Sequence, residues 1–267
     1  MKVLLKTTVA GTNYPKTVIV LFLFMSLSFQ AVSSINDEID RIEQKLGVRV
    51  AVKLPVLGSW DVVKYRICSD TSVLIPYLRL MEREYSKYPK GYFSKIGIRT
   101  IAIGEELMIN RQKRAAIPDP YKGILFLSVD KPGNSETYQV HVMHHELHHC
   151  AEYKHWNSMN YHWDSWSDVN NATFNYQGSG ASAYNDSSID WYTINKPFEG
   201  FINMYSTTAE EEDRAEIVAI IMTDAEKPLL EKFLRDDKIL QQKVLLVKIL
   251  LTEISGEEDT YWNKAFN

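Results

Sequence analysis

The stretch ETYQVHVMHHELHHCAEY, residues 136–153, decides how this sequence is interpreted. Met143, Leu147 and Cys150 recur at spacings of four and three residues, which predicts a helix with one apolar stripe packed against a sheet. All seven histidines of the chain fall within residues 141–162, and five of them lie on this helix. The clustering indicates that the chemistry of the protein is located here.

Residues 145–149, HELHH, match the pattern H-E-x-x-H. His145 and His149 are four residues apart, so they share one helix face and can bind a single Zn²⁺ ion. Glu146 would reach the water on that ion rather than the ion itself. The pairs His141/His145 and His144/His148 have the same spacing but no glutamate after the first histidine. The simpler interpretation is a patch of histidines on a solvated helix face.

Residues 210–222, EEEDRAEIVAIIM, predict a second helix whose acidic side chains are candidates for a third ligand. Glu212 and Glu216 are four residues apart and share a face. Negative charge at a helix N-terminus is favourable in any case, which would account for Glu210 and Glu211. It accounts less well for Glu216, which is in mid-helix beside two small alanines.

The rest of the sequence predicts an α+β fold. The chain has 267 residues, of which 45% are hydrophobic and 24% charged, and its net charge of −4 gives no basic footprint for nucleic acid. Strands are expected at 48–54, 96–103 and 123–129, and helices at 34–47, 71–87, 209–223 and 241–254. Strands that precede most of the helices favour a small mixed sheet followed by a helical C-terminal part.

Residues 1–33 resemble a secretory signal peptide, with three lysines, no acidic residue and an apolar core of 12 residues at 18–29. The alternative is an amphipathic anchor that is not cleaved. We therefore expect a secreted or periplasmic, monomeric protein with one domain at 34–267 and no stable membrane span after cleavage. Cys68 and Cys150 could form one bridge, although a buried free thiol at Cys150 is slightly favoured.

The motif and the downstream segment YSTTAEEEDRAE, residues 205–216, resemble gluzincin metallopeptidases of the anthrax lethal factor and Pro-Pro endopeptidase type. They are closer still to the bacterial family described as "putative zinc-binding metallopeptidases". The resemblance implies a zincin-like fold, Glu212 as third ligand, Tyr205 as oxyanion donor and Glu216 as a partner that orients a ligand histidine. It also implies one Zn²⁺ per chain.

These residues together predict an endopeptidase that hydrolyses a peptide or protein substrate by a metal-activated water, with Glu146 as general base. In zincins an extended peptide commonly lies along an edge strand, for which residues 123–129 are the candidate, with 117–121 at the rim of the cleft. The alternative for both segments is plain sheet core. Residues 156–200 are rich in aromatic side chains, and residues 156–195 contain no lysine or arginine. They predict either a cover over the cleft, with a flexible tip at 178–180, or a separate small core.

Two other functions remain open at this point. The protein could be an inactive binding module that keeps the zinc fold, or an extracellular protein that captures metal. The second would bind more than one Zn²⁺ per chain and would use His141, His144 and His155. Otherwise His144, His148 and His155 are expected to lie behind the ligands or on the surface.

Overall fold

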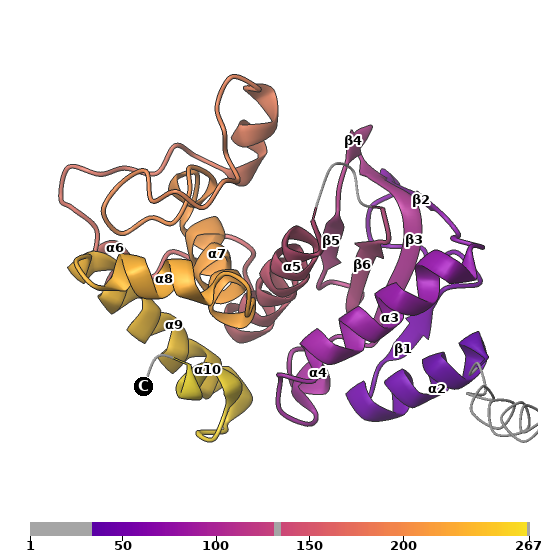
Figure 1. Cartoon of the computed structure of the whole chain (residues 1–267). Helices are drawn as coiled ribbons and strands as arrows, with labels where there is room; N and C mark the ends of the chain where they lie inside the picture. Colours follow the sequence, from indigo (N-terminus) through magenta and orange to yellow (C-terminus); the bar gives the residue numbers. More distant parts are fainter. Residues whose placement is uncertain (1–33, 131–134, 266–267) are drawn as a thin grey trace, which may run out of the picture. The chain divides into compact units, whose positions relative to one another are not determined.

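In Figure 1 the sheet and the helices that come before it or between its strands lie on one side, the C-terminal helices lie on the other, and the helix α5 (Glu136–Trp156) lies between them. The computed structural model describes residues 34–130 and 135–265. The expected signal peptide at 1–33 lies outside these residues. The remaining helices are α2 (Ile35–Leu46), α3 (Thr71–Tyr85), α4 (Tyr92–Lys95), α6 (Asp164–Ser167), α7 (Glu210–Met222), α8 (Lys227–Leu234), α9 (Lys238–Ser255) and α10 (Tyr261–Lys264).

The sheet has the strand order β1–β3–β6–β5. Strands β1 (Arg49–Ala51), β3 (Thr100–Ile109) and β6 (Ile124–Ser128) run parallel, and β5 (Ala116–Asp119) runs antiparallel to β6. The far half of β3 also pairs with β2 (Val63–Arg66) and β4 (Gln112–Lys113). This mixed sheet with several helices confirms the predicted α+β class.

Strand β6 is an interior strand, so the expectation that residues 123–129 form the edge is wrong. All five side chains of β6 are buried, because both faces of the strand are covered. Leu125 and Leu127 join the main core, and Ile124 and Phe126 join a second cluster against which Trp60 and Tyr65 pack. The edge strand next to β6 is β5, which contains Pro118. Proline has no N–H group to give to a ladder, and an edge strand tolerates it best.

The main core lies between the sheet and the helices. Met143, Leu147 and Cys150 of α5 are at most 1% exposed and join it, which confirms the predicted apolar stripe. Cys68 and Cys150 are both buried free thiols. Ile96 ends α4 and Gly97 has a φ of 79°, so the strand predicted from residue 96 begins only at Thr100.

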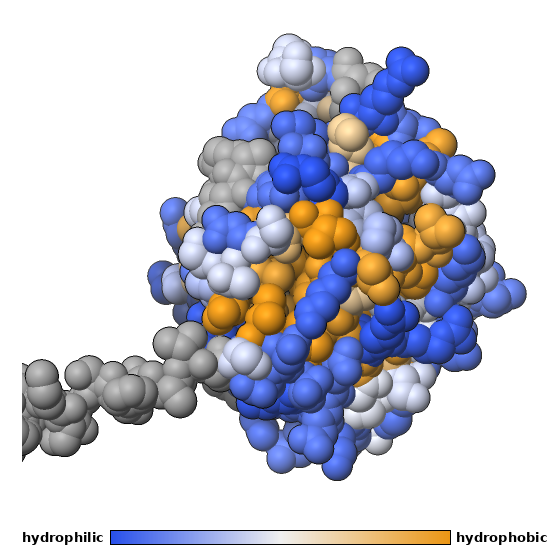
Figure 2. Space-filling view, turned by 90° about the vertical axis from the view of Figure 1, so that its right-hand side faces the viewer, coloured by the Kyte–Doolittle hydropathy of each residue, from blue (hydrophilic) through white to orange (hydrophobic). Residues whose placement is uncertain are grey.

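Some apolar side chains remain at the surface. Figure 2 shows apolar surface on the side of the molecule that carries the sheet and α3, where polar side chains surround it. Leu54, Leu57, Val62 and Val73 are among the exposed apolar residues of the described chain. In the described part of the chain, no helix is both long enough and apolar enough to cross a membrane.

Candidate metal centre and active site

Helix α5 presents one face of histidines to α7. Ser135 caps the start of α5 by accepting a hydrogen bond from the Tyr138 amide, and Asn157 ends it in the left-handed conformation. His141, His145 and His149 follow one another at intervals of four residues and are at most 7% exposed. Because residues four apart lie on the same side of a helix, these three rings line one edge of α5.

Helix α7 packs beside α5 and brings two carboxylates to this edge. Its inward residues Ile217, Ile220 and Ile221 are fully buried in the core. Ala215 and Ala219 are also fully buried, and their small side chains allow a close approach of the neighbouring backbone. Glu212 and Glu216, one turn apart on α7, therefore lie against the histidines of α5.

His145, His149 and Glu212 converge on one point. Nε2 of His145 lies 3.0 Å from Nε2 of His149 and 3.0 Å from Oε2 of Glu212, and Nε2 of His149 lies 3.3 Å from the same oxygen. A tetrahedral zinc ion with bonds of about 2.0–2.1 Å separates its ligands by about 3.3 Å. Two imidazole nitrogens and one carboxylate oxygen at this spacing are a donor set that fits zinc with one position left open.

The electrostatics of the three groups also favour a cation. Burial opposes a charge on His145, but its contacts with Glu212 and Glu216 outweigh burial and raise its pKa well above the ordinary value. The pKa of His149 is raised as well, against its burial, by Glu212. The two carboxylates thus create a negative site in which positive charge is stabilised, whether it is carried by protons or by a metal ion.

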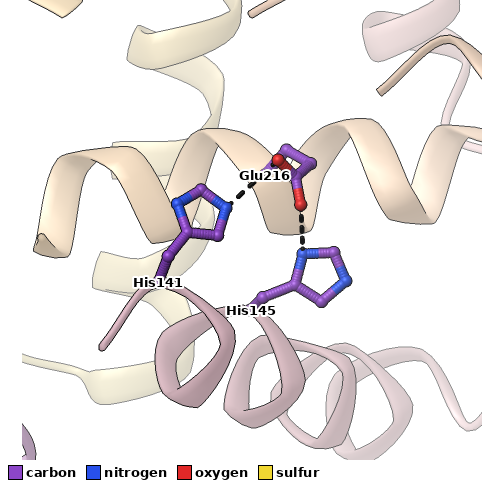
Figure 3. Close-up of side chains that lie close together, drawn as sticks. All are labelled: His141, His145 and Glu216. Atoms are coloured by element: carbon purple, nitrogen blue, oxygen red, sulfur yellow. Dashed lines mark hydrogen bonds and ion pairs between the residues drawn. The ribbon is translucent and has the colours of Figure 1, made fainter. Parts of the chain in front are cut away.

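Glu216 lies behind His145, outside the group of three. Its Oε1 is 2.8 Å from Nδ1 of His145, and its Oε2 is 3.1 Å from Nε2 of His141. Figure 3 shows the carboxylate between the two rings, with one contact to each. The resemblance implied that Glu216 orients a ligand histidine, and that role stays a prediction. The part played by His141 was not anticipated, although its spacing of four from His145 was visible.

Glu146 and Tyr205 stand where two cavities meet. One cavity has a volume of about 570 Å³ and the other about 250 Å³, and both are lined by Glu146, Tyr205, Arg114 and Ala116. Tyr205 begins the short helix η2 (Tyr205–Thr207), and its ring lies 5.9 Å from that of His145. Burial raises the pKa of Glu146, and the neighbouring His145 and His149 oppose that rise.

Residues 156–200 pack partly in the main core and partly in a small cluster beside Tyr205. Trp166 is fully buried in the main core, and Trp191 and Ala183 pack with Tyr205 in a small cluster of their own. Glu210 holds the segment to α7 by accepting hydrogen bonds from Ser167 Oγ at 2.6 Å and the Trp163 amide at 3.2 Å. Glu210 thus does more than supply negative charge to the helix terminus.

Gly180 brings this segment against the candidate metal centre. It is buried, and a Cβ atom built on it would lie 2.1 Å from Oε1 of Glu212 and 2.6 Å from the Tyr205 hydroxyl. Gly180, the last residue of the tip expected to be flexible at 178–180, is therefore packed against two residues of the candidate site. Sequence offered no signal for this contact, because only the folded chain brings residue 180 to residue 212.

The other histidines are divided between core and surface. His144 contacts the Tyr88 hydroxyl at 3.0 Å and Glu84 at 3.3 Å, and His148 contacts Glu152 at 2.9 Å. Both rings are almost fully buried and lie away from the group of three. His155 and His162 are exposed.

The fold and the site together define a class: an α+β protein whose His/Glu centre has the donor set of a catalytic zinc site. Residues 127–253, slightly less than half of the chain, match the family model described as "Putative zinc-binding metallo-peptidase". The structure is similar to one described as the "Crystal structure of a putative zinc-binding metallo-peptidase from Bacteroides caccae ATCC 43185". That similarity has a TM-score of 0.55 and 15% sequence identity, and it covers 86% of this chain and 90% of that chain. A search of curated proteins found no match.

The two matches carry different weight. At this sequence identity the structural similarity establishes the fold. The family match supports a zinc peptidase in general.

Proposed function

We propose that this protein is a secreted, zinc-dependent endopeptidase of the gluzincin type, with His145, His149 and Glu212 as ligands of one Zn²⁺ ion. The observation that carries the proposal is the convergence of three ligand atoms within 3.0–3.3 Å of one another. Two of them belong to the H-E-x-x-H motif, and the third comes from a helix more than 60 residues away.

Bound zinc would supply a Lewis acid that polarises the scissile carbonyl and makes water a stronger acid. Glu146 follows His145 directly and lines both cavities, so its carboxylate can take a proton from water and pass it to the leaving amine. Its raised pKa brings it closer to the pH at which it would work, which suits a group that both accepts and donates a proton.

Tyr205 is proposed to donate a hydrogen bond to the oxyanion that forms at the attacked carbonyl. Its ring lies beside His145, and it also lines both cavities. A donor of this kind acts mainly in the transition state and contributes on the order of 3 kcal/mol.

A peptide substrate would lie along the edge strand β5. Ile117 and Pro118 line the smaller cavity on one side, and Gly180 and Ala181 line it on the other. The larger cavity continues past Glu146 towards Tyr138, Val142 and Leu229. Because the two cavities share Glu146 and Tyr205, an extended chain could occupy both and present one peptide bond to these residues.

The test is zinc content together with cleavage of a peptide library, for the wild type and Glu146→Gln. We expect one zinc per chain in both proteins and loss of turnover only in Glu146→Gln. Glu136→Gln, on the same helix but at its exposed start, is the matched control and should cleave normally. Removal of zinc with a chelator should abolish cleavage, and added zinc should restore it.

Other outcomes would point to the two alternative functions. Stoichiometric zinc without cleavage of any peptide would indicate an inactive binding module. More than one zinc per chain, reduced by substitution of His144 or His155, would indicate metal capture. The expected secretion through residues 1–33 belongs to the same proposal and can be tested by locating the expressed protein and sequencing its N-terminus.

A further inference from the structure

His141 lies between two buried glutamates. Its Nδ1 is 2.6 Å from Oε2 of Glu226, and its Nε2 is 3.1 Å from Oε2 of Glu216. His141, Glu216 and Glu226 are 6%, 3% and 8% exposed. A carboxylate can only accept hydrogen bonds, so both ring nitrogens must donate, which requires the positively charged imidazolium.

The charge on His141 is favourable at this position. Burial opposes it, but the carboxylates of Glu216 and Glu226 outweigh burial and raise the pKa of His141 to about 10. The positive charge of His141 therefore balances part of the negative charge of the buried Glu216 and Glu226.

Glu216 accepts hydrogen bonds from His141 of α5 and from Asn203, and it also contacts His145 of α5. Its Oε2 accepts from Nε2 of His141 and from Nδ2 of Asn203, which lies 2.5 Å away. Its Oε1 is left to face Nδ1 of His145 at 2.8 Å. Because one oxygen is occupied by His141 and Asn203, the carboxylate cannot rotate without breaking contacts, and the other oxygen stays on His145 (Figure 3).

We propose that His141, with Glu226 behind it, is a positioning residue that fixes Glu216 against His145 and so aims Nε2 of His145 at the zinc site. The proposal rests on the proposed function. A carboxylate on the second nitrogen of a ligand histidine sets the orientation of the ring and strengthens the histidine as a ligand. Here that carboxylate is itself oriented by a histidine and a second glutamate, so the chain of contacts runs Glu226–His141–Glu216–His145.

The first experiment measures zinc affinity by competition with a chelator. His141→Leu removes both donors and should weaken zinc binding about 10–100-fold, the loss typical of groups that orient a ligand. His141→Gln keeps one amide donor and should recover part of that loss. His144→Leu is the matched control, since His144 is an equally buried histidine on α5 with contacts at both nitrogens. It should reduce stability without changing zinc affinity.

A double-mutant cycle tests whether His141 acts through Glu216. We expect Glu216→Gln to weaken zinc binding, and His141→Leu to add little in its presence, because the two residues serve one contact. Glu226→Gln provides a milder variant if His141→Leu does not fold. Like His141→Leu, it should lower zinc affinity. It should also lower kcat more than it changes KM.

Three results would overturn the proposal. The first is unchanged zinc affinity in both His141→Leu and Glu226→Gln. The second is that the effects of His141→Leu and Glu216→Gln on zinc affinity add in full. The third is a second zinc ion per chain that His141→Leu removes. The last result would make the cluster a metal site of its own. These failures are distinct from failure of the proposed function, in which the wild type itself would bind no zinc or cleave no peptide.

Discussion

Gly180→Ala tests how closely residues 156–200 are fitted to the metal centre. The added Cβ would lie 2.1 Å from Oε1 and 2.6 Å from Cδ of Glu212, whereas ordinary van der Waals contacts begin at 3.4 Å. The carboxylate or the segment would have to withdraw by roughly 1 Å. A zinc–oxygen bond is about 2.0–2.2 Å long, so a shift of that size removes Glu212 from a ligand position.

The expected loss differs between the two forms of the protein. In the zinc-free protein, both Glu212 and the Tyr205 hydroxyl would have to move away from the new methyl group, and Glu212 would lose its contacts with His145 and His149. The free energy of unfolding should therefore fall, although Gly180 has no positive φ that an alanine would strain. With zinc bound, Glu212 is fixed, so we expect zinc affinity to fall about 10–100-fold. Turnover should fall by about 100-fold, the effect of a 1 Å error in catalytic geometry.

The assay combines chelator competition, peptide cleavage at saturating zinc and urea unfolding of the zinc-free protein. Gly178→Ala is the contrasting variant, since Gly178 has a φ of 129° and no atom within 4 Å of an added Cβ. It should lower stability through backbone strain and leave zinc affinity unchanged. Wild-type zinc affinity and turnover in Gly180→Ala would refute the argument that this glycine forms a wall of the metal centre.

Three further predictions concern the Tyr205 hydroxyl, the buried ion pair of Lys243 and Asp213, and the stability of the protein in acid. Tyr205→Phe should lower kcat about 100–1000-fold with zinc content unchanged, and a loss below tenfold in steady-state kinetics would exclude oxyanion donation. Lys243→Met leaves the fully buried Asp213 without the cation that lies 2.6 Å away, so urea unfolding should show a loss of about 3–5 kcal/mol; less than 1 kcal/mol would contradict this. Burial would raise the pKa of Glu152, but Arg214 and His148 lower it from 4.5 to about 2. The stability that Glu152 contributes is therefore present above about pH 4.5 and is lost as the pH falls towards 2. Glu152→Gln should lack this part of the acid dependence in unfolding curves measured from pH 6 to pH 2, and an unchanged curve would be inconsistent with it.

The long helices could be predicted because their signals are local. The apolar stripe of α5, the charged start of α7 and the repeats of α3 and α9 each lie within one segment of the sequence. The shorter strands were missed for the same reason. β2 alternates between partly buried and exposed side chains but is only four residues long, and β5 contains a proline, which weakens the signal of a strand.

The sequence by itself determined the α+β class, the helix α5 and the candidate set of His145, Glu146 and His149, since helical spacing alone places the two histidines on one face. Only the tertiary structure decided what surrounds that helix face. The strand order put β5 at the edge and β6 inside, and the fold brought Gly180 over Glu212 and Glu226 against His141. Those contacts join residues separated by tens of positions in segments without a repeating pattern. They depend on how the whole chain packs, and no short stretch of sequence contains that information.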